Sequence, residues 1–405
     1  MSKKIMIMSC SLDGRLIAAV QVANELGYET VAIVREEDDI STVDADSCFA
    51  VDGEKVEMLL DIAKKEKIDG VFGAWDKTVY AAAVIAKELG LPGNSSECVT
   101  RFLEKGSFRR LQKEAGVFCP AFLETDTVQG LEEKCSELRF PVIVKPDLCS
   151  SSFGQTTLYD RQDLVSAFRA AKAYSRDEAV IVEEYIEQDS LCILEADVFV
   201  YGDDILWDGI HWSFRFPEAP LRPVIASYPA SLDMDQENEF KNAVRNVFSA
   251  AGATLGGFNI EGFFTKDGRF FIIEINPRPA GYYSHKEIQL FCGIDFPKLI
   301  VTTAVGDLSY YEEQKTIPRP RHNVLAYAVF SFKPGIVDHV YIDPLIRDSL
   351  VEYLEFPGGE PGAYIDDIHA DNRPVGVAFF VFPSGEELVR TRDRIRDLVY
   401  VVLRD

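Results

Sequence analysis

The chain has 405 residues, of which 47% are hydrophobic and 27% are charged. This composition is globular, and the length predicts two or three packed domains. The net charge of −24 argues against a nucleic-acid or anionic-membrane surface, since both need clustered lysine and arginine, although a local group of cations can still bind an anionic substrate. We therefore expect no nucleic-acid partner and no membrane partner.

The sequence also lacks the patterns of secretion and of structural zinc. The apolar run at 5–8 is shorter than the core of a signal peptide, and no stretch approaches the ~18 apolar residues of a membrane span. The eight cysteines include no Cys-x-x-Cys pair, and the five histidines form no His-Glu-x-x-His motif. We expect a cytoplasmic protein with reduced thiols.

Strands and helices alternate in the first hundred residues. Hydrophobic periodicity and terminating glycines predict strands at 4–8, 29–34 and 70–73, and helices at 16–26, 56–67 and 79–89. This alternation is typical of parallel βαβ units and predicts a Rossmann-like α/β domain at 1–100. The first turn, 9–14, holds one glycine where a dinucleotide-binding turn needs three, which argues against NAD or FAD.

The next two hundred residues mix helices with strands in hairpin-like pairs. We predict helices at 105–115 and 163–174, and strands at 141–146, 179–184, 258–265 and 270–275. Asp267-Gly268 separates the last two strands and is a strong hairpin signal. These elements predict an α+β domain at 101–310.

A third unit follows a segment at 314–321 that is rich in proline and charge and is expected to be a linker. Strand-like runs at 323–332 and 375–383 and a helical pattern at 386–398 predict a small α+β domain at 311–405.

The hairpin carries the residues that best define a chemistry. Glu274 and Asn276 are two apart on one strand and share a face, and the turn brings Glu261 to the same place. Two carboxylates and an amide oxygen are hard ligands suited to Mg²⁺ that is shared with phosphates. Arg278 follows on the same parity and can bind a phosphoryl group with its fork of donors.

Two lysines and a polar loop add a phosphate-binding pattern. Lys145 ends a buried-looking strand before a loop whose amides can hold phosphate oxygens, and the loop contains Ser150, Ser151, Ser152 and Gly154. Lys105 opens a helix, where a cation is unfavourable unless an anion lies near. Where the strand 179–184 ends, the backbone of Glu183, Glu184 and Tyr185 can pair with an adenine edge and Ile186 can cover its face.

Together these segments resemble an ATP-grasp ligase over about residues 1–310. The resemblance rests on Leu103-Glu104-Lys105 with its helix to Gly116, on 141–146, on 182–186 and on Glu274-Ile275-Asn276-Pro277-Arg278-Pro279, the last of which is highly specific. The chain is similar to the carboxylate–amine ligases of that superfamily, including L-amino-acid ligases that make dipeptides. The C-terminal part resembles their closing domain loosely.

The resemblance implies a cofactor, a lid and residue roles. ATP would lie on Lys105 and Lys145 under a mobile lid at about 120–186, with Glu183, Glu184, Tyr185 and Ile186 at the adenine and Asp189 at the ribose. Glu261, Glu274 and Asn276 would bind Mg²⁺, with Mn²⁺ as an alternative ion, and Arg278 would steady the acyl phosphate. The loop 149–154 is poorer in glycine than is usual in the family, and Gln188 stands where a glycine is usual.

Substrate residues are less well marked. His211, Trp212 and Arg215 lie in an aromatic and basic stretch, and Tyr283 and His285 follow the metal strand directly. We expect both segments to line the substrate pocket, with Arg215 or His285 pairing a carboxylate. Core packing for the aromatic side chains and surface placement for the charges are the alternatives.

The expected function is an ATP- and magnesium-dependent enzyme that activates a carboxylate as an acyl phosphate and couples it to an amine. Amino-acid substrates giving a dipeptide or amide are expected, and a homodimer is expected from the resemblance. The alternatives are an ATP-grasp ligase of purine or carbamoyl-phosphate-type metabolism and a catalytically silent nucleotide-binding protein.

Overall fold

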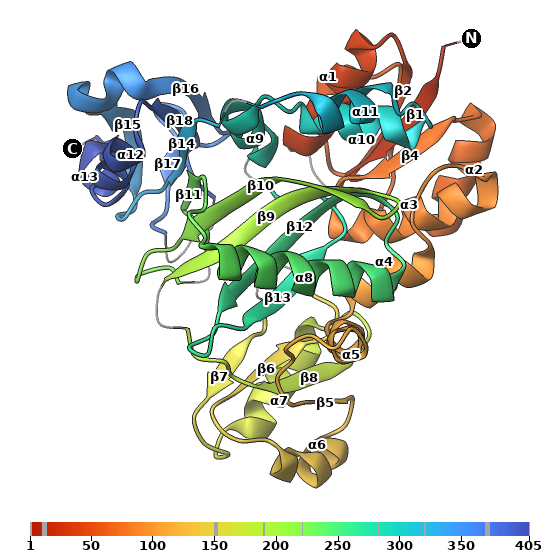
Figure 1. Ribbon diagram of the computed structural model, residues 1–405, viewed down its shortest axis with the longest axis vertical. Coiled ribbons are helices and arrows are strands. Elements are labelled where there is room, and N and C mark those ends of the chain that lie inside the picture. Colours follow the sequence, from red (N-terminus) through yellow and green to blue (C-terminus); the bar gives the residue numbers. More distant parts are fainter. Residues whose placement is uncertain are drawn as a thin grey trace.

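The computed structural model describes residues 2–9, 14–149, 153–188, 191–220, 222–281, 283–319, 321–368 and 373–404. Figure 1 shows four sheets, of which the largest runs through the middle of the molecule. The predicted combination of an N-terminal α/β part with α+β parts is confirmed. Among the described helices, none combines the length and the apolar character that a membrane crossing requires.

The N-terminal part is a parallel sheet in the order β3-β2-β1-β4. Its strands are β1 Lys4–Met8, β2 Glu29–Val34, β3 Ser47–Ala50 and β4 Gly70–Gly73, and its helices are α1 Gly14–Glu25, the 3₁₀ turn η1 Ile40–Thr42, α2 Val56–Glu66 and α3 Asp76–Leu89. Apolar residues cover both faces, as expected for parallel strands. The predicted strands agree with β1, β2 and β4, whereas β3 was not predicted.

A helix from much later in the chain completes this part. Helix α10, Phe296–Ala304, packs against α1 and β4, and Val301 and Ala304 join the core formed by α1, β1 and β2. The N-terminal core is therefore not confined to the range 1–100 that the sequence suggested.

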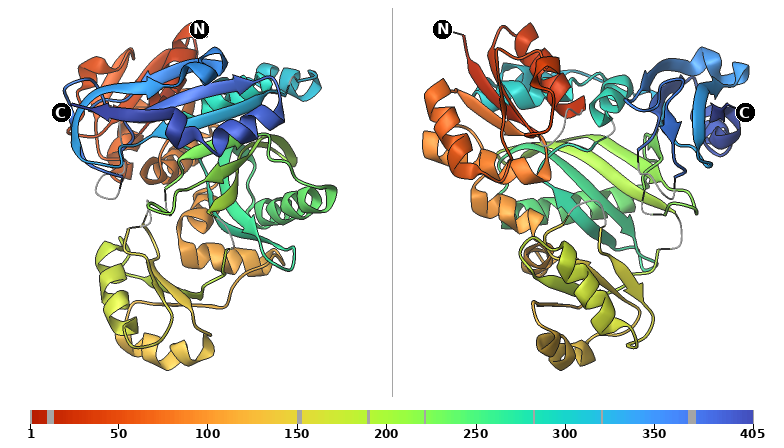
Figure 2. Two further views of the ribbon diagram at one scale, coloured as in Figure 1. Left: turned by 90° about the vertical axis from the view of Figure 1, so that its left-hand side faces the viewer. Right: turned by 180° about the vertical axis from the view of Figure 1, so that it is seen from behind.

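A small antiparallel sheet, in the order β5-β8-β6-β7, forms a separate lobe with its own core. Helices α4 Ser96–Leu103 and α5 Lys105–Glu114 lead into it, and it contains β5 Phe122–Thr125, α6 Val128–Lys134, η2 Cys135–Glu137, β6 Val142–Pro146, β7 Thr156–Leu158, α7 Leu164–Tyr174 and β8 Val180–Glu184. In Figures 1 and 2 this lobe, drawn in yellow, projects below the central sheet. We call it the lid lobe.

The central sheet is antiparallel and has the order β13-β12-β9-β10-β11-β14-β18-β16. Its strands are β9 Cys192–Tyr201, β10 Asp204–Phe214, β11 Ile225–Tyr228, β12 Leu255–Phe264, β13 Phe270–Asn276, β14 Asn323–Val329, β16 Leu350–Glu355 and β18 Gly376–Phe382. Helix α8, Met234–Ala251, covers one face with an apolar core. The opposite face carries the candidate site.

The C-terminal strands are divided between two sheets. Strands β14, β16 and β18 extend the central sheet, and β15 Gly335–Ile342, β17 Tyr364–Ile365 and β19 Val399–Leu403 form a second sheet packed nearby. The remaining elements are α9 Ser284–Cys292, α11 Ser309–Thr316, η3 Pro344–Ser349, α12 Gly385–Arg392 and α13 Ile395–Leu398. The suggested boundary at 310 thus separates strands that share one sheet.

Two local predictions in this region were wrong. The segment 314–321 is not wholly a linker, because its first residues form the last turn of α11. The helix predicted at 386–398 is interrupted, since α12 ends at Arg392 and α13 begins at Ile395.

Candidate active site

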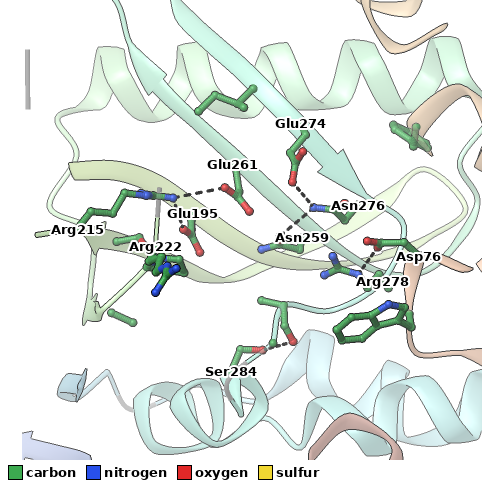
Figure 3. A pocket seen from close by; sticks show the side chains of 18 of the residues that line it. Asp76, Glu195, Arg215, Arg222, Asn259, Glu261, Glu274, Asn276, Arg278 and Ser284 are labelled. Atoms are coloured by element: carbon green, nitrogen blue, oxygen red, sulfur yellow. Dashed lines mark hydrogen bonds and ion pairs between the residues drawn. The ribbon is translucent and has the colours of Figure 1, made fainter. Parts of the chain in front are cut away.

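A cavity of about 550 Å³ lies where the central sheet, the N-terminal part and the lid lobe meet. Strands β9, β10, β12 and β13 form its floor, and α3, α5, β6 and α9 contribute to its walls. Figure 3 shows the acidic and basic side chains that converge on it.

A row of polar residues crosses four adjacent strands of the cavity floor. Strand register places His211 opposite Glu195, Glu195 opposite Glu261, and Glu261 opposite Glu274. Two residues along, on the same face, Asp197 lies opposite Asn259 and Asn259 lies opposite Asn276. The hairpin alone joins Glu261 to Glu274, whereas β9 and β10 extend the row toward His211.

Glu274, Asn276 and Glu261 present oxygen atoms to the cavity. The Asn276 amide nitrogen donates to Glu274 Oε1 at 3.0 Å and to Asn259 Oδ1 at 3.3 Å, which turns the Asn276 amide oxygen to other partners. Burial raises the pKa of Glu261 well above its usual value, and Glu195 and Glu274 raise it further against the opposing effect of Arg215. A bound cation would relieve this crowding of carboxylates.

These residues fit a magnesium ion that is shared with phosphates. Within the described residues no group of three or more His, Cys, Asp or Glu side chains is arranged to hold a metal by itself. Two carboxylates and an amide oxygen are instead the partial oxygen set that Mg²⁺ uses when phosphates and water complete its coordination.

Arg278 stands beside this oxygen set and is anchored by the N-terminal part. Its Nε donates to Asp76 Oδ1 at 2.5 Å, and its Nη1 donates to the carbonyl of Pro279 at 3.0 Å. Burial lowers the pKa of Arg278, but Asp76, Glu274 and Glu261 raise it more, so the guanidinium stays charged. Asp76 is the first residue of α3 and connects that helix to the end of β13.

Lys145 lies in a buried ionic network between the lid lobe and α5. Its Nζ is 2.5 Å from Glu183 Oε1, and Arg109 Nε donates to Glu183 Oε2 at 2.8 Å. Burial lowers the pKa of Lys145 to about 8, with Arg109 adding to that effect and Glu183 opposing it. Lys145 and Arg109 line the cavity, whereas Glu183 is enclosed between them.

The carboxylates of both glutamates have partners within the protein: that of Glu183 neutralises two buried cations, and that of Glu184 accepts from the backbone and guanidinium of Arg139 at 3.0 and 3.2 Å. The predicted adenine contact through the backbone of this segment stays a prediction. The amides of Glu184 and Tyr185 already donate to the carbonyls of Ala121 and Pro141 within the lid lobe. Ile186 packs against the small apolar cluster of β9, β12 and β13.

Lys105 is held at the start of the loop that follows β6. Its Nζ donates to the carbonyls of Cys149 at 2.7 Å and Asp147 at 3.3 Å, and the Asp147 carboxylate accepts from the amide of Gly106 at 2.6 Å. Gly154 has a φ of +72°, which suits glycine, and Phe153 beside it lines the cavity. Ser150, Ser151, Ser152 and Asp189 lie outside the described residues.

The predicted substrate residues divide into two groups. His211 and Arg215 line the cavity, and Arg215 Nη2 is 3.4 Å from Glu195 and 3.6 Å from Glu261. Trp212 points to the other face of β10 and packs with the α8 core, because successive strand residues alternate faces. The prediction was therefore wrong for Trp212.

Tyr283 and His285 also lie outside the cavity lining, contrary to the prediction. Tyr283 fills the space beside Gly14 at the start of α1, and its ring centroid is 5.7 Å from that of Phe356 and equally far from that of His285. Both residues begin α9, and it is the helix face bearing Ser284 and Glu287 that points into the cavity.

Several lining residues were not singled out from the sequence. They include Asp76, Arg109, Glu195, Asn259, Arg222 and Glu287. A signal existed for Glu195, because Glu195 and Asp197 are two apart inside an otherwise apolar run and therefore share one face of β9. The others meet only through tertiary packing.

Comparisons with known proteins agree with this geometry. A family model described as the D-ala D-ala ligase C-terminus matches residues 117–303, and one described as the ATP-grasp N-terminal domain matches residues 20–93. Together these matches cover more than half of the chain. The chain belongs to the ATP-grasp superfamily.

Solved structures of similar fold span the whole chain. An L-amino acid ligase from Bacillus licheniformis is 20% identical, with a TM-score of 0.83 and complete coverage of both chains. A phosphoribosylglycinamide synthetase from Anaerococcus prevotii is also 20% identical, with a TM-score of 0.79 and complete coverage. The biotin carboxylase domain dimer of Hydrogenobacter thermophilus 2-oxoglutarate carboxylase, solved with MgADP, has a TM-score of 0.71 at 18% identity, covering 99% of this chain and 91% of that one.

The chain spans only part of the length of the curated relatives that it matches in sequence. The chain is 25% identical to the uncharacterized protein y4rH of Sinorhizobium fredii over 83% of its own length and 67% of that protein. It is 25% identical to the carbamoyl phosphate synthase large chain of Vibrio vulnificus over 63% of its length, but spans only 24% of that relative. It spans 14% of the multifunctional protein pyrABCN of Emericella nidulans, at 24% identity over 77% of this chain.

Proposed function

We propose that this protein uses ATP and Mg²⁺ to convert an amino acid into its acyl phosphate and couples it to the amino group of a second substrate, giving a dipeptide or an amide. The observation that carries the proposal is the Glu261–Glu274–Asn276 oxygen set beside three cations, Lys105, Lys145 and Arg278, in one cavity. The similarity in fold to an L-amino acid ligase supports amino acids as substrates.

The residues of the cavity account for the chemistry of activation. The substrate carboxylate attacks the γ-phosphorus of ATP, a C–O–P bond forms, and ADP leaves. Lys145 and Lys105 are placed to hold the phosphates, and Arg278, fixed by Asp76, is placed to balance charge on the transferred group. Mg²⁺ held by Glu261, Glu274 and Asn276 would neutralise phosphate charge.

The second half-reaction needs no covalent bond to the protein. The amine attacks the acyl carbon, a C–N bond forms, and phosphate leaves with the C–O bond pair. Desolvation inside the cavity protects the acyl phosphate from water. The expected roles of Mn²⁺, of a homodimer and of a cytoplasmic location stay predictions.

A second candidate is an ATP-grasp ligase that acts on a phosphorylated amine, as in purine-type metabolism. The similarity in fold to a phosphoribosylglycinamide synthetase favours it, as do Arg222 and Arg176, which line the cavity and can bind a further phosphate. The third candidate is a protein that binds nucleotide without turnover.

The test is ADP and phosphate release in the presence of ATP, Mg²⁺ and amino acids offered in pairwise pools. We expect release that depends on a particular pool, with the product named by mass spectrometry. Glu274→Ala should lower this rate by at least about 100-fold, because it removes a metal ligand. Glu237→Ala, on the solvent side of α8, is the matched control and should behave as wild type.

Other outcomes of this assay would favour the other two candidate functions. Release only with a phosphorylated amine would favour the second candidate. Nucleotide binding without release in any pool would contradict the ligase proposal and favour a silent nucleotide-binding protein.

A further inference from the structure

The end of the cavity remote from Glu274 holds titratable groups that the activation chemistry does not use. His211 of β10 and Glu287 of α9 both line the cavity, and their side chains are buried, with exposed fractions of 3% and 5%. Tyr228 stacks on His211 with ring centroids 4.5 Å apart. Glu195 of β9 also lines the cavity, and both it and the neighbouring Asp197 are buried.

The surroundings of His211 favour its charged form, which makes it a weaker proton acceptor than a free imidazole. Its Nδ1 is 3.2 Å from the carbonyl of Gly209, and its Nε2 faces Glu195 Oε2 at 3.7 Å. Burial lowers the pKa of His211, but the interactions with Glu195 raise it more. Both ring nitrogens face oxygen acceptors, an arrangement that favours the imidazolium.

The carboxylate of Glu195 lies between His211 and Arg215. Burial raises its pKa, but His211 and Arg215 lower it more, and Arg215 Nη2 lies 3.4 Å from its carboxylate. Glu195 is thus an ionised carboxylate that fixes His211 and Arg215 in place. It is not available to take up a proton near neutral pH.

Glu287 is the one carboxylate of this group, among the described residues, that both lines the cavity and titrates near neutrality. The groups that face it are His211 from β10, Tyr228 from β11, and Asp197 and Glu195 from β9. Burial raises the pKa of Glu287, His211 and Tyr228 lower it, and the two β9 carboxylates raise it, so that the net pKa is about 7.

Carboxylates outnumber cationic side chains at this end of the cavity. Asp197 Oδ1 accepts from the amide of Ala280 at 2.9 Å, but Asp197 Oδ2 is buried and makes no hydrogen bond with the residues that the structure describes. Three carboxylates face one imidazolium and one guanidinium here. A ligand ammonium group would supply the positive charge that balances the third carboxylate, and one of its N–H donors could pair with Asp197 Oδ2.

We propose that this wall is the subsite for the amine substrate and that Glu287 accepts the proton that its ammonium group must lose before attack. The inference rests on the proposed ligase function and deepens it. One N–H proton passes from the ammonium to the Glu287 carboxylate. The nitrogen lone pair then forms the C–N bond as the C–O bond to phosphate breaks, and the second proton leaves with phosphate.

The test separates amine deprotonation from activation of the acid. Hydroxylamine is an uncharged nucleophile at pH 7.5, so it traps the acyl phosphate as a hydroxamate without a proton acceptor. In Glu287→Gln we expect amide formation to fall about 100-fold or more, in the range of general-base catalysis, while ATP-dependent hydroxamate formation stays close to the wild-type rate.

The pH profile gives an independent readout. Wild-type amide formation should decline as pH falls through about 7, because the Glu287 carboxylate becomes protonated. This limb should be missing from the residual rate of Glu287→Gln and should persist in Glu287→Asp. Thermal unfolding of both variants checks that they fold, and Glu237→Gln on the far face of the sheet is the control for a lost surface carboxylate.

Two results would overturn the assignment. An equal loss of amide and hydroxamate formation in folded Glu287→Gln would make Glu287 a purely structural residue. Amide formation at the wild-type rate, with an unchanged acidic limb, would show that another group takes the proton. If wild-type protein forms no hydroxamate with any acid, the ligase function itself fails, and the inference fails with it.

Discussion

At the scale of single residues, the network of Arg109, Glu183 and Lys145 shows how a buried lysine is paired inside the fold. Arg109 is only 1% exposed, and its Nη1 also donates to the carbonyls of Ile272 at 3.3 Å and Ile273 at 3.1 Å on β13. Burial raises the pKa of Glu183, but Arg109 and Lys145 together lower it to about 2. Because Arg109 stays on Glu183, Lys145 can turn toward a phosphate without leaving an unpaired buried carboxylate.

Replacing Arg109 tests this balance. Arg109→Met should lower the free energy of unfolding by about 3–5 kcal/mol, since it breaks a buried ionic network and leaves carboxylate charge poorly compensated. Arg110→Met is the matched control: that side chain is 55% exposed, pairs with Glu124, and its loss should cost less than about 1 kcal/mol. Urea unfolding measures both, and equal losses would show that burial of the network does not matter.

At the scale of elements, local signals predicted much of the fold and part of the site. The Asp267-Gly268 turn and the alternation of β13 predicted that Glu261, Glu274 and Asn276 share a face, and strand register places them so. The extension of the row to Glu195 and His211 depends on the pairing of β9 with both β10 and β12. Such register is non-local and is not encoded in spacing along the chain.

Other features were not predicted from the sequence, for different physical reasons. Helix α8 was not predicted although its signals are present, namely Asp233 and Gln236 as a capping box and Gly252 at the C-terminal end. Trp212 was placed in the pocket because the stretch was interpreted by composition rather than by strand parity. Glu287 carries no local signal, because only the packing of α9 against β14 and β10 brings it to the cavity.

Position 262 in the hairpin leaves no room for a side chain larger than that of glycine. The register of β12 and β13 shifts between Glu261 and Gly262, and a Cβ on Gly262 would lie 2.5 Å from the carbonyl oxygen of Phe271. Gly262→Ala should therefore destabilise the protein by about 1–3 kcal/mol and displace Glu261 from Glu274. Thermal unfolding measures the cost.

Gly385 provides the control for that substitution. It is the first residue of α12, and the nearest atom to an added Cβ is Asn323 Oδ1 at 3.6 Å. Gly385→Ala should be neutral or slightly stabilising, as alanine favours a helix over glycine. A Gly262→Ala protein as stable as Gly385→Ala would mean that the bulge accommodates a side chain.

At the scale of the whole molecule, parts that are distant in sequence are held around one cavity. Asp76 ties the N-terminal part to Arg278, α10 completes the N-terminal core, and β14 and β18 extend the central sheet that carries the site. Arg109 links the lid lobe to the central sheet, because it contacts both Glu183 and the carbonyl of Ile272. The lid lobe has a hydrophobic core of its own. Figure 2 shows the lobe projecting from the rest of the molecule. Despite a net charge of −24, the cations are gathered where phosphates would lie.

The most direct test of the central claim is the binding of ADP with and without Mg²⁺, measured by calorimetry on the full chain. The account predicts that wild-type protein binds MgADP at least about tenfold more tightly than ADP in EDTA, because Glu261, Glu274 and Asn276 share the ion with the phosphates. Glu274→Ala should lose that magnesium dependence, while Glu237→Ala should keep it. Equal affinities with and without Mg²⁺ in the wild type, or unchanged magnesium dependence in Glu274→Ala, would contradict the assignment of this site.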